Sequence, residues 1–371
     1  MNFGEQQRKS SVLLEQYKQP ARIISQVNSH VNGDYNKRVL DKLRGPDGQL
    51  PQRISNMDPD LVRRIVGEIE HQDVNVCWDD IAGLEHAKNC ITETIVWPLL
   101  RPDIFTGVRT AGGGLLLFGP PGTGKSMIGK AIAGEANATF FNISASSLLS
   151  KWVGEAENLV RALFEVASCL QPAVIFFDEI DSLLSKRGQN DENEVRRRIK
   201  TQFFIEMEGI SSGNKQILLV GATNRPKDLD EAARRRLAKR LYIALPSAEA
   251  RASIVCRLLE KHGLLNLSGD DIDTICNLTG GFSGSDMENL VKDASLGPLR
   301  DAIKQGKDIK MLKTENLRPI SLQDFVNSLE VIRPSVSALN SMDIMNGTKT
   351  LAAYHFRNQL EGIFNFFFLL Y

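Results

Sequence analysis

The stretch Gly119-Pro-Pro-Gly-Thr-Gly-Lys-Ser126 decides the fold of this chain. It has the spacing G-x-x-x-x-G-K-[ST], in which the backbone N–H groups of a glycine-rich loop and the start of a helix cradle phosphate groups. An apolar run at 115–118 before it predicts a buried strand, and residues 127–133 after it predict a helix. We therefore expect a strand, a phosphate-binding loop and a helix in succession. A glycine-rich turn that binds nothing is the alternative.

Two residues at the end of this loop carry the chemistry that nucleotide binding needs. Lys125 can reach the outer phosphates as a positive charge, and the hydroxyl of Ser126 can bind Mg²⁺. The predicted contacts to the nucleotide are the whole loop and the residue after it: Gly119, Pro120, Pro121, Gly122, Thr123, Gly124, Lys125, Ser126 and Met127.

A second segment, Ala173-Val-Ile-Phe-Phe-Asp-Glu-Ile-Asp181, is an apolar run that ends in carboxylates. A run this apolar is typical of a strand buried on both faces of a parallel sheet, and ligands bind at the carboxyl ends of such strands. Asp178 can bind Mg²⁺ directly or through water, and Glu179 can act as the general base for an attacking water. A helix cap is the alternative role for one of these acids.

Composition narrows the class of protein. The chain has 371 residues, 42% of them hydrophobic, with 45 Lys plus Arg and 45 Asp plus Glu, so its formal net charge is zero and gives no sign of nucleic-acid binding. The five cysteines are dispersed without a C-x-x-C pair, which predicts a reducing compartment and no structural zinc. The polar start lacks a signal peptide, and no apolar stretch reaches the roughly 18 residues of a membrane span. We expect a soluble protein of the nucleus or cytoplasm.

The pattern along the chain predicts four parts. Residues 1–57 are polar and predict a flexible lead. Residues 58–245 predict an α/β domain that starts with one helix and contains a parallel sheet with helices on both faces. Residues 246–335 predict a small helical domain, and 336–371 form a tail. The expected strands lie near 114–118, 139–143, 173–177, 216–221 and 240–244, and the expected helices of the small domain at 248–262, 270–278, 284–305 and 321–331.

Four further segments resemble the motifs of AAA ATPases, in the order that this family has them. They are Trp78-Asp-Asp-Ile-Ala-Gly83, Gly221-Ala-Thr-Asn224, Leu229-Asp-Glu-Ala-Ala-Arg-Arg-Arg-Leu237 and Thr279-Gly-Gly-Phe-Ser-Gly-Ser-Asp286. The similarity runs from about residue 74 to Ser337 and implies a P-loop AAA module followed by a helical lid domain. It also implies ATP and Mg²⁺ as cofactors.

The resemblance assigns roles to residues in these motifs. The backbone of Ile81, Ala82 and Gly83 would contact the adenine, and Gly284 and Ser285 would close on the nucleotide from the lid. Asn224 would help Glu179 to orient the water. Arg235 and Arg236 would be arginine fingers that reach the nucleotide of a neighbouring subunit in a homohexamer. A solvated basic face is the alternative for the arginine run.

Within the family, the chain is similar to the meiotic clade, which includes katanin, spastin, the fidgetins and the vacuolar-sorting ATPase, and most of all to fidgetin-like ATPases. The similarity rests on Trp97-Pro-Leu-Leu-Arg-Pro-Asp-Ile-Phe105, Ser150-Lys-Trp-Val-Gly154, Gln171-Pro-Ala-Val174 and Pro334-Ser-Val-Ser337. It places Lys151, Trp152 and Val153 in a central pore that grips a polypeptide, and residues 194–200 in a second pore loop. A buried core tryptophan is the alternative for Trp152.

These observations predict an ATP-driven protein remodeller whose substrate is tubulin in microtubules or a recombinase filament of DNA repair and meiotic recombination. A direct nucleic-acid motor is disfavoured because no DNA-binding module is added. The tail after Ser337 lacks the helix rich in Tyr and Trp that ends relatives of this clade, and a shifted reading frame would restore a similar ending. The alternative function is therefore a catalytically weak regulatory or binding subunit.

Overall fold

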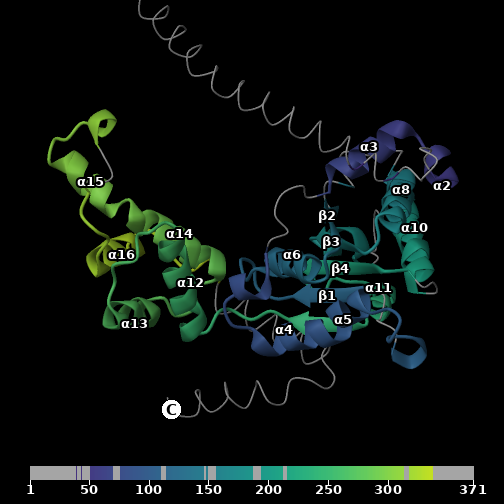
Figure 1. Ribbon diagram of the computed structural model, residues 1–371, viewed down its shortest axis with the longest axis horizontal. Coiled ribbons are helices and arrows are strands. Elements are labelled where there is room, and N and C mark those ends of the chain that lie inside the picture. The colour runs from purple at the N-terminus through teal and green to yellow at the C-terminus, as the bar shows by residue number, and fades with distance from the viewer. Residues whose placement is uncertain are drawn as a thin grey trace, which may run out of the picture.

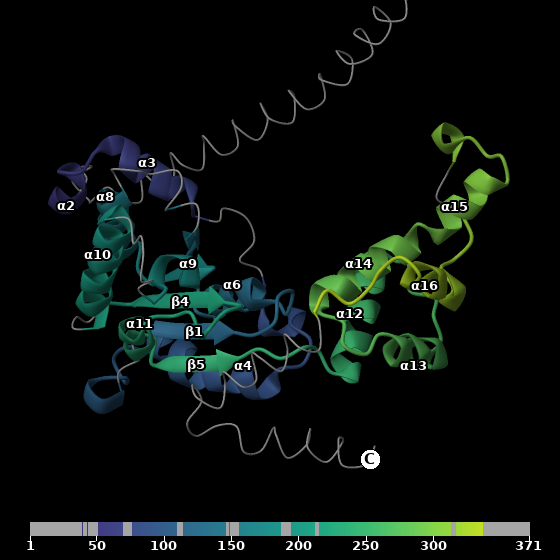
Figure 2. The same cartoon turned by 180° about the vertical axis from the view of Figure 1, so that it is seen from behind.

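The protein is described by a computed structural model at residues 39, 43, 51–69, 76–109, 114–145, 148, 156–186, 194–211, 215–312 and 317–336. A sheet with helices packed around it lies beside a separate group of helices (Figure 1). The view from behind shows the same two parts (Figure 2). This confirms the predicted fold class of an α/β domain followed by a small helical domain. The exact domain limits stay predictions, as do the roles assigned to the tail.

The sheet has five parallel strands in the order β2-β3-β4-β1-β5. Each lies at a predicted position: β1 (Gly114–Phe118), β2 (Thr139–Ser144), β3 (Ala173–Asp178), β4 (Ile217–Thr223) and β5 (Lys239–Tyr242). All residues of β1 and β4 are buried, which explains their unbroken apolar sequence. β1 pairs with β4 and β5, so the phosphate loop leaves the interior of the sheet rather than an edge.

Helices cover both faces of the sheet because successive strand residues point to opposite sides. Leu116 and Phe177 belong to a core on one face, and Leu117 and Phe176 to a core on the other. The helices on the first face are α3 (Pro59–Gly67), α8 (Ala156–Cys169), α9 (Ile180–Leu184) and α10 (Glu194–Ser211). Those on the second are α4 (Glu85–Ile91), the π-helix η2 (Thr92–Val96), α5 (Trp97–Leu100) and α6 (Lys125–Glu135).

Short elements complete this domain: α2 (Gln52–Ser55), η1 (Trp78–Asp80), η3 (Gly107–Arg109) and α11 (Glu231–Arg236). Residues of the predicted flexible lead contribute to the core, since Val39, Leu43 and Ile54 are at most 4% exposed. Val39 and Leu43 are both helical and both belong to the core on the α3 and α8 face of the sheet. Isolated apolar residues in a polar segment are a weak signal, which is why the sequence did not reveal this packing.

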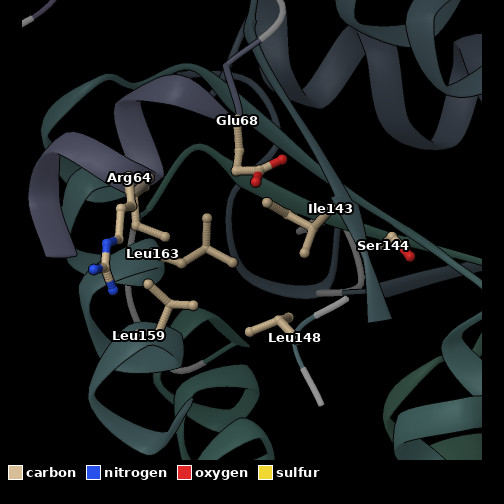
Figure 3. A pocket seen from close by; sticks show the side chains of 8 residues that line it. Arg64, Glu68, Ile143, Ser144, Leu148, Leu159 and Leu163 are labelled. Carbon is tan, nitrogen blue, oxygen red and sulfur yellow. The ribbon is translucent and has the colours of Figure 1, made fainter. Parts of the chain in front are cut away.

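The predicted helix before the sheet domain packs on its edge. At the end of α3, the backbone N–H of Asn142 on β2 donates to the carbonyl of Glu68 at 3.1 Å. A small hollow of about 20 Å³ remains where α3, β2 and α8 meet, with Arg64 and Glu68 beside leucines of the core (Figure 3). This volume is near the smallest that holds a single water. The edge strand β2 is thus covered rather than open to another chain.

The helical domain contains α12 (Ala248–Lys261), α13 (Gly269–Leu278), α14 (Gly284–Ser295), α15 (Gly297–Lys304), η4 (Ile309–Met311) and α16 (Leu322–Leu329). Its core gathers apolar side chains of α12, α13, α14 and α16, among them Val255, Leu259, Ile275, Leu290 and Phe325. Serines at the N-caps of α13, α14 and α16 form capping boxes with the aspartates three positions later.

One expected helix, residues 284–305, is in fact two. α14 ends at Ser295 and α15 begins at Gly297, with Pro298 in its first turn. Proline has no N–H to donate and its ring clashes with the preceding turn inside a helix, so Pro298 can stand in the first turn of α15 but not inside one continuous helix. A Cβ on Gly297 would lie 2.2 Å from Oδ1 of Asp324 at the start of α16, so only glycine fits there.

None of the helices in the described ranges is both long and apolar enough to cross a lipid bilayer.

Candidate active site

The phosphate loop has the shape that its sequence predicts. β1 ends at Phe118, the loop follows, and α6 begins at Lys125 with Gly124 as its N-cap. A Cβ on Gly119 would lie 2.1 Å from the carbonyl oxygen of Ile243, so this position allows no side chain. The glycines thus let the backbone turn sharply between a buried strand and a helix N-terminus, where an anion is favoured.

The ammonium of Lys125 is buried beneath this loop. The residue is 8% exposed, and its Nζ donates to the carbonyl oxygens of Gly119 at 3.1 Å and Pro120 at 2.7 Å. Burial lowers the pKa of Lys125 to about 8, while the negative charge of Asp178 opposes part of this shift. The carbonyl oxygens satisfy the ammonium only as neutral acceptors, so a bound phosphate would be a better partner for it.

Ser126 and Asp178 bring oxygen ligands together from different elements. The hydroxyl of Ser126, on the first turn of α6, lies 3.5 Å from Oδ2 of Asp178 at the end of β3. The other oxygen, Oδ1, accepts a hydrogen bond from the backbone N–H of Glu179 at 2.9 Å. Mg²⁺ usually takes one or two protein ligands and completes its shell with phosphate and water, so this pair fits that ion.

Glu179 has an unusual backbone conformation. Its φ is +50°, in the left-handed region, and it is the exposed N-cap residue of α9. Such strain in a residue other than glycine costs about 1–2 kcal/mol and concentrates at functional sites. The residue directly follows the metal-ligand candidate Asp178 at the end of β3.

A hydrogen bond that the sequence did not predict supports Asn224. The hydroxyl of Thr223, at the end of β4, donates to Oδ1 of Asp181 on α9 at 2.5 Å, and it accepts from the backbone N–H of Arg225 at 2.9 Å. The exposed Asn224 lies between these two anchored residues. β4 and the carboxylate segment after β3 are therefore held in register at the point where both meet the site.

A cavity of about 560 Å³ lies against these groups, within the range of common ligand sites. It brings together most of the predicted contacts: Ile81, Ala82, Pro121, Gly122, Thr123, Gly124, Lys125, Ser126, Met127, Asp178, Asn224, Gly284 and Ser285. Gly83, Gly119, Pro120, Glu179, Arg235 and Arg236 are not part of its lining. The roles assigned to all these residues stay predictions.

The predicted adenine-contacting segment is fixed by the sheet domain. The backbone N–H of Trp78 donates to Oε1 of Glu135 at the end of α6, at 3.0 Å. Ile81 is 7% exposed and belongs to the apolar core on the face of the sheet that α4 and α6 cover. Residues 81 and 82 therefore form one wall of the cavity.

The helical domain forms the opposite wall. The backbone N–H of Ser285, at the start of α14, donates to the carbonyl of Gly122 in the phosphate loop at 3.1 Å. The sequence reasoning missed the other lining residues of this wall, which are Ile254, Arg257, Leu258 and Glu288. These residues lie on α12 and α14. The helical periodicity of the two segments indicates that each helix has an apolar face, but it does not show that these residues line a cavity.

The two predicted finger arginines differ in their surroundings. Arg235 is exposed and forms an ion pair with Glu231 one helical turn earlier, with 2.6 Å between Nη2 and Oε1. Arg236 is instead bound to Glu208 on α10, and its guanidinium carbon lies 4.5 Å from the ring centre of Phe204. Lys151, Trp152 and Val153, the predicted pore residues, lie outside the described residues.

Comparisons with known proteins show which family the two domains resemble. A model described as the ATPase family associated with various cellular activities (AAA) matches residues 115–245, and an AAA+ lid domain model matches residues 269–313. The ATPase family AAA domain-containing protein FIGL1 of Arabidopsis thaliana is 66% identical over 304 residues, which are 82% of this chain and 45% of that protein. Human Fidgetin-like protein 1 is 52% identical over 306 residues, again 82% of this chain and 45% of the relative.

Solved structures show the same similarity. The crystal structure of the FIGL-1 AAA domain in complex with ADP is 46% identical, has a TM-score of 0.72, and matches 80% of this chain and 98% of that one. A structure described as the structural basis for katanin self-assembly is 32% identical with a TM-score of 0.63, over 78% of this chain and 96% of that one. The chain thus spans about half the length of the whole relatives but nearly all of the solved domain.

Proposed function

The chain belongs to the AAA family of ATPases and is similar to its fidgetin-like members, and from this premise we propose that it hydrolyses ATP with Mg²⁺ to remodel protein polymers. The observation that carries the proposal is the cavity between the two domains, in which Lys125, Ser126 and Asp178 meet. The ADP in the similar FIGL-1 domain supports a nucleotide as its ligand.

Different residues of the site would bind the phosphates, hold the metal ion and activate the water. Bound ATP with Mg²⁺ supplies a γ-phosphoryl group whose transfer to water releases energy. The charge of Lys125 binds and neutralises phosphate oxygens, and Ser126 and Asp178 would hold the metal ion. Glu179 would accept the proton of the water, and Asn224 would orient it. Ile81 and Ala82 would contact the base, and Gly284 and Ser285 at the start of α14 would close on the nucleotide.

The two predicted finger arginines lie outside the lining of the cavity in their own chain. Neither Arg235 nor Arg236 lines the cavity of its own chain, although an added guanidinium at the phosphates is worth about 10³–10⁵ in rate. We infer that Arg235 serves the cavity of a neighbouring copy, which makes the active form a ring, a homohexamer as in the family. The similarity to a katanin structure that concerns self-assembly supports this step.

The proposed substrate is a polypeptide drawn through the centre of that ring by Lys151, Trp152 and Val153. The similarity to katanin and to the fidgetin-like proteins supports polymers as targets, with microtubules and recombinase filaments of meiotic recombination as the two candidates. Either would place the protein in the nucleus or the cytoplasm.

The test uses the purified chain with ATP and Mg²⁺, together with stabilised microtubules or assembled recombinase filaments. We expect ATP turnover that the matching polymer accelerates, and shortening of that polymer seen by microscopy. Trp152→Ala should keep basal turnover and lose shortening, because in the proposed pore its aromatic side chain would grip the substrate polypeptide and have no part in phosphate chemistry. Nucleotide binding with turnover no faster than that of Glu179→Gln would instead support the catalytically weak regulatory subunit.

A further inference from the structure

Lys200, on α10, is a charged residue that the fold buries outside the cavity. It is 7% exposed. The sequence predicts residues 194–200 as a second pore loop, but the structure shows them as the first turns of α10, so this expectation of a loop is corrected. An ammonium is buried only when it is well paired, because desolvation of an unpaired charge is very costly. The partners of Lys200 therefore indicate what its burial achieves.

Two contacts join Lys200 to segments that border the catalytic groups. Its Nζ donates to the carbonyl oxygen of Ser185 at 2.7 Å and lies 2.7 Å from Oδ2 of Asp230. Ser185 follows α9, the helix that begins directly after Glu179. Asp230 is the N-cap of α11, and its Oδ1 accepts from the backbone N–H of Ala232 at 2.9 Å. One ammonium thus binds the ends of α9 and α11 to α10.

The two segments that Lys200 bridges are also paired with each other. The backbone N–H of Asp230 donates to the carbonyl of Leu184 at 2.9 Å, and that of Lys186 donates to the carbonyl of Asp228 at 2.8 Å. At its other end, α11 is held to α10 by the contact of Arg236 with Glu208. α11 is therefore fixed at both ends, while Arg235 between them is left exposed.

We propose that Lys200 is a positioning residue that holds α11 so that Arg235 can reach the nucleotide of the next subunit. The proposal rests on the proposed function, in which that arginine acts across a subunit interface. Lys200 itself touches neither nucleotide nor reacting atoms.

Substitutions of Lys200 and Asp230 test whether Lys200 positions α11 for catalysis or only stabilises the fold. Lys200→Met, of similar length, should lower kcat at least tenfold while the affinity for ADP stays within twofold. Lys200→Arg keeps the charge and the hydrogen-bond donors and should retain at least half of the parent rate. Asp230→Asn keeps a capping oxygen for α11 but loses the carboxylate charge, and it should lower kcat in the same way. The double variant should lose no more than the worse single variant.

A mixing experiment decides whether the defect lies in the finger. Lys200→Met subunits keep an intact cavity, and Lys125→Ala subunits keep an intact finger, so mixed rings should regain several-fold activity over either variant alone. The positive control is Arg235→Ala mixed with Lys125→Ala, and the matched lysine control is Lys88→Met, which removes an ion pair with Glu85 on α4 and should leave turnover unchanged.

The outcomes are distinct. If the Arg235 control regains activity and the Lys200 mixture does not, the positioning role is wrong while the proposed function stands. If the Arg235 control also fails to regain activity, the finger does not act between subunits, and both proposals fall. Equal loss in Lys200→Met and Lys200→Arg, or a loss of ADP affinity that matches the loss of kcat, likewise overturns the positioning role.

Discussion

Gly122 of the phosphate loop lies so close to Ser283 of the helical domain that a Cβ built on Gly122 would be 2.6 Å from the hydroxyl oxygen of Ser283. The two residues are 161 positions apart by their numbers, and Ser283 caps the helix whose next turn faces the cavity. The absence of a side chain at Gly122 is therefore what lets the two domains meet at the nucleotide site.

This contact predicts that Gly122→Ala destabilises the protein more than Gly124→Ala does. Both glycines have positive φ, +72° and +84°, so both substitutions carry a backbone cost of about 1–2 kcal/mol. Only at Gly122 would the new methyl group meet another domain, because nothing lies within 4 Å of a Cβ on Gly124. Urea unfolding without nucleotide measures the difference, and equal losses in the two variants would contradict the contact.

The chemistry of the site predicts different defects when Lys125 and Glu179 are replaced. Lys125→Ala removes the charge that binds phosphate, so ADP affinity should fall at least a hundredfold. Glu179→Gln should bind ADP and ATP as the parent does and turn over at least a hundredfold more slowly, since it removes only the proton acceptor. Titration with a fluorescent ADP analogue and a phosphate-release assay distinguish the two. Parent-like ADP affinity in Lys125→Ala would show that the ligand of this cavity is not held by its phosphates.

Burial of Lys125 makes nucleotide binding sensitive to pH. With its pKa at about 8, the side chain of the unliganded protein is charged at pH 7 and mostly neutral at pH 9. A phosphate needs the charged form, so binding takes up a proton above pH 8 and the affinity for ADP falls with rising pH. The expected loss is about tenfold between pH 7 and pH 9.

The control for this pH dependence is Lys125→Arg, whose guanidinium keeps its charge at both pH values. Whatever affinity this variant has should change little between pH 7 and pH 9. An affinity of the parent that is flat over the same range would mean that the ammonium is not the group that meets the phosphate.

The two arginines of α11 should separate in a stability measurement. Arg236→Ala removes the stacking on Phe204 and the ion pair with Glu208, so the free energy of unfolding should fall by about 1–2 kcal/mol. Arg235→Ala removes only an exposed ion pair and should change it by less than about 0.5 kcal/mol, yet it should lose most of the turnover. An Arg235 variant with parent-like turnover would remove it from the catalytic machinery.

The features that could be predicted from the sequence depend on residues that are close together in the chain or on general rules of sheet topology. The strands, the phosphate loop and the proximity of Ser126 to Asp178 could be predicted, because each depends on a local pattern and on the rule that parallel strands end at one edge of a sheet. The break before Gly297 was also readable from Pro298, although we expected one helix. By contrast, the cavity wall of Arg257 and Glu288 depends on how two domains pack.

The same limit applies to single side chains. The sequence treats Arg235 and Arg236 alike, and only the position of Glu208 and Phe204 on another helix sets them apart. Likewise, nothing in the run around Lys200 shows that one of its basic residues is buried against Asp230. Such differences come from contacts between residues far apart in the sequence. A single sequence does not show these contacts before the fold is known.

A buried carboxylate joins the end of the helical domain to the nucleotide site, and this leads to the last prediction. Oδ2 of Asp286 accepts from the backbone N–H and hydroxyl of Ser283, at 2.9 and 2.8 Å, and from those of Ser335, at 3.2 and 3.0 Å. Burial alone would raise the pKa of Asp286, but these hydrogen bonds outweigh it and hold the pKa below the ordinary value.

Asp286→Ala should therefore leave buried donors unpaired at the start of α14 and lower the free energy of unfolding by about 2–3 kcal/mol. Because the preceding residue, Ser285, binds the phosphate loop, ADP affinity should fall as well. Ser335→Ala is the matched control: it removes one donor from the same carboxylate and leaves the cap of α14 intact, so stability should fall by less than about 1 kcal/mol and ADP affinity should persist.

The same carboxylate predicts a dependence of stability on pH. Since the pKa of Asp286 is lower in the folded than in the unfolded protein, the stability that its charge contributes is fully present above the unfolded pKa and is lost as pH falls through the folded pKa. The stability gap between parent and Asp286→Ala should accordingly narrow in acid, and a gap that is constant from pH 7 down to acid unfolding would show that the charge of the carboxylate plays no part.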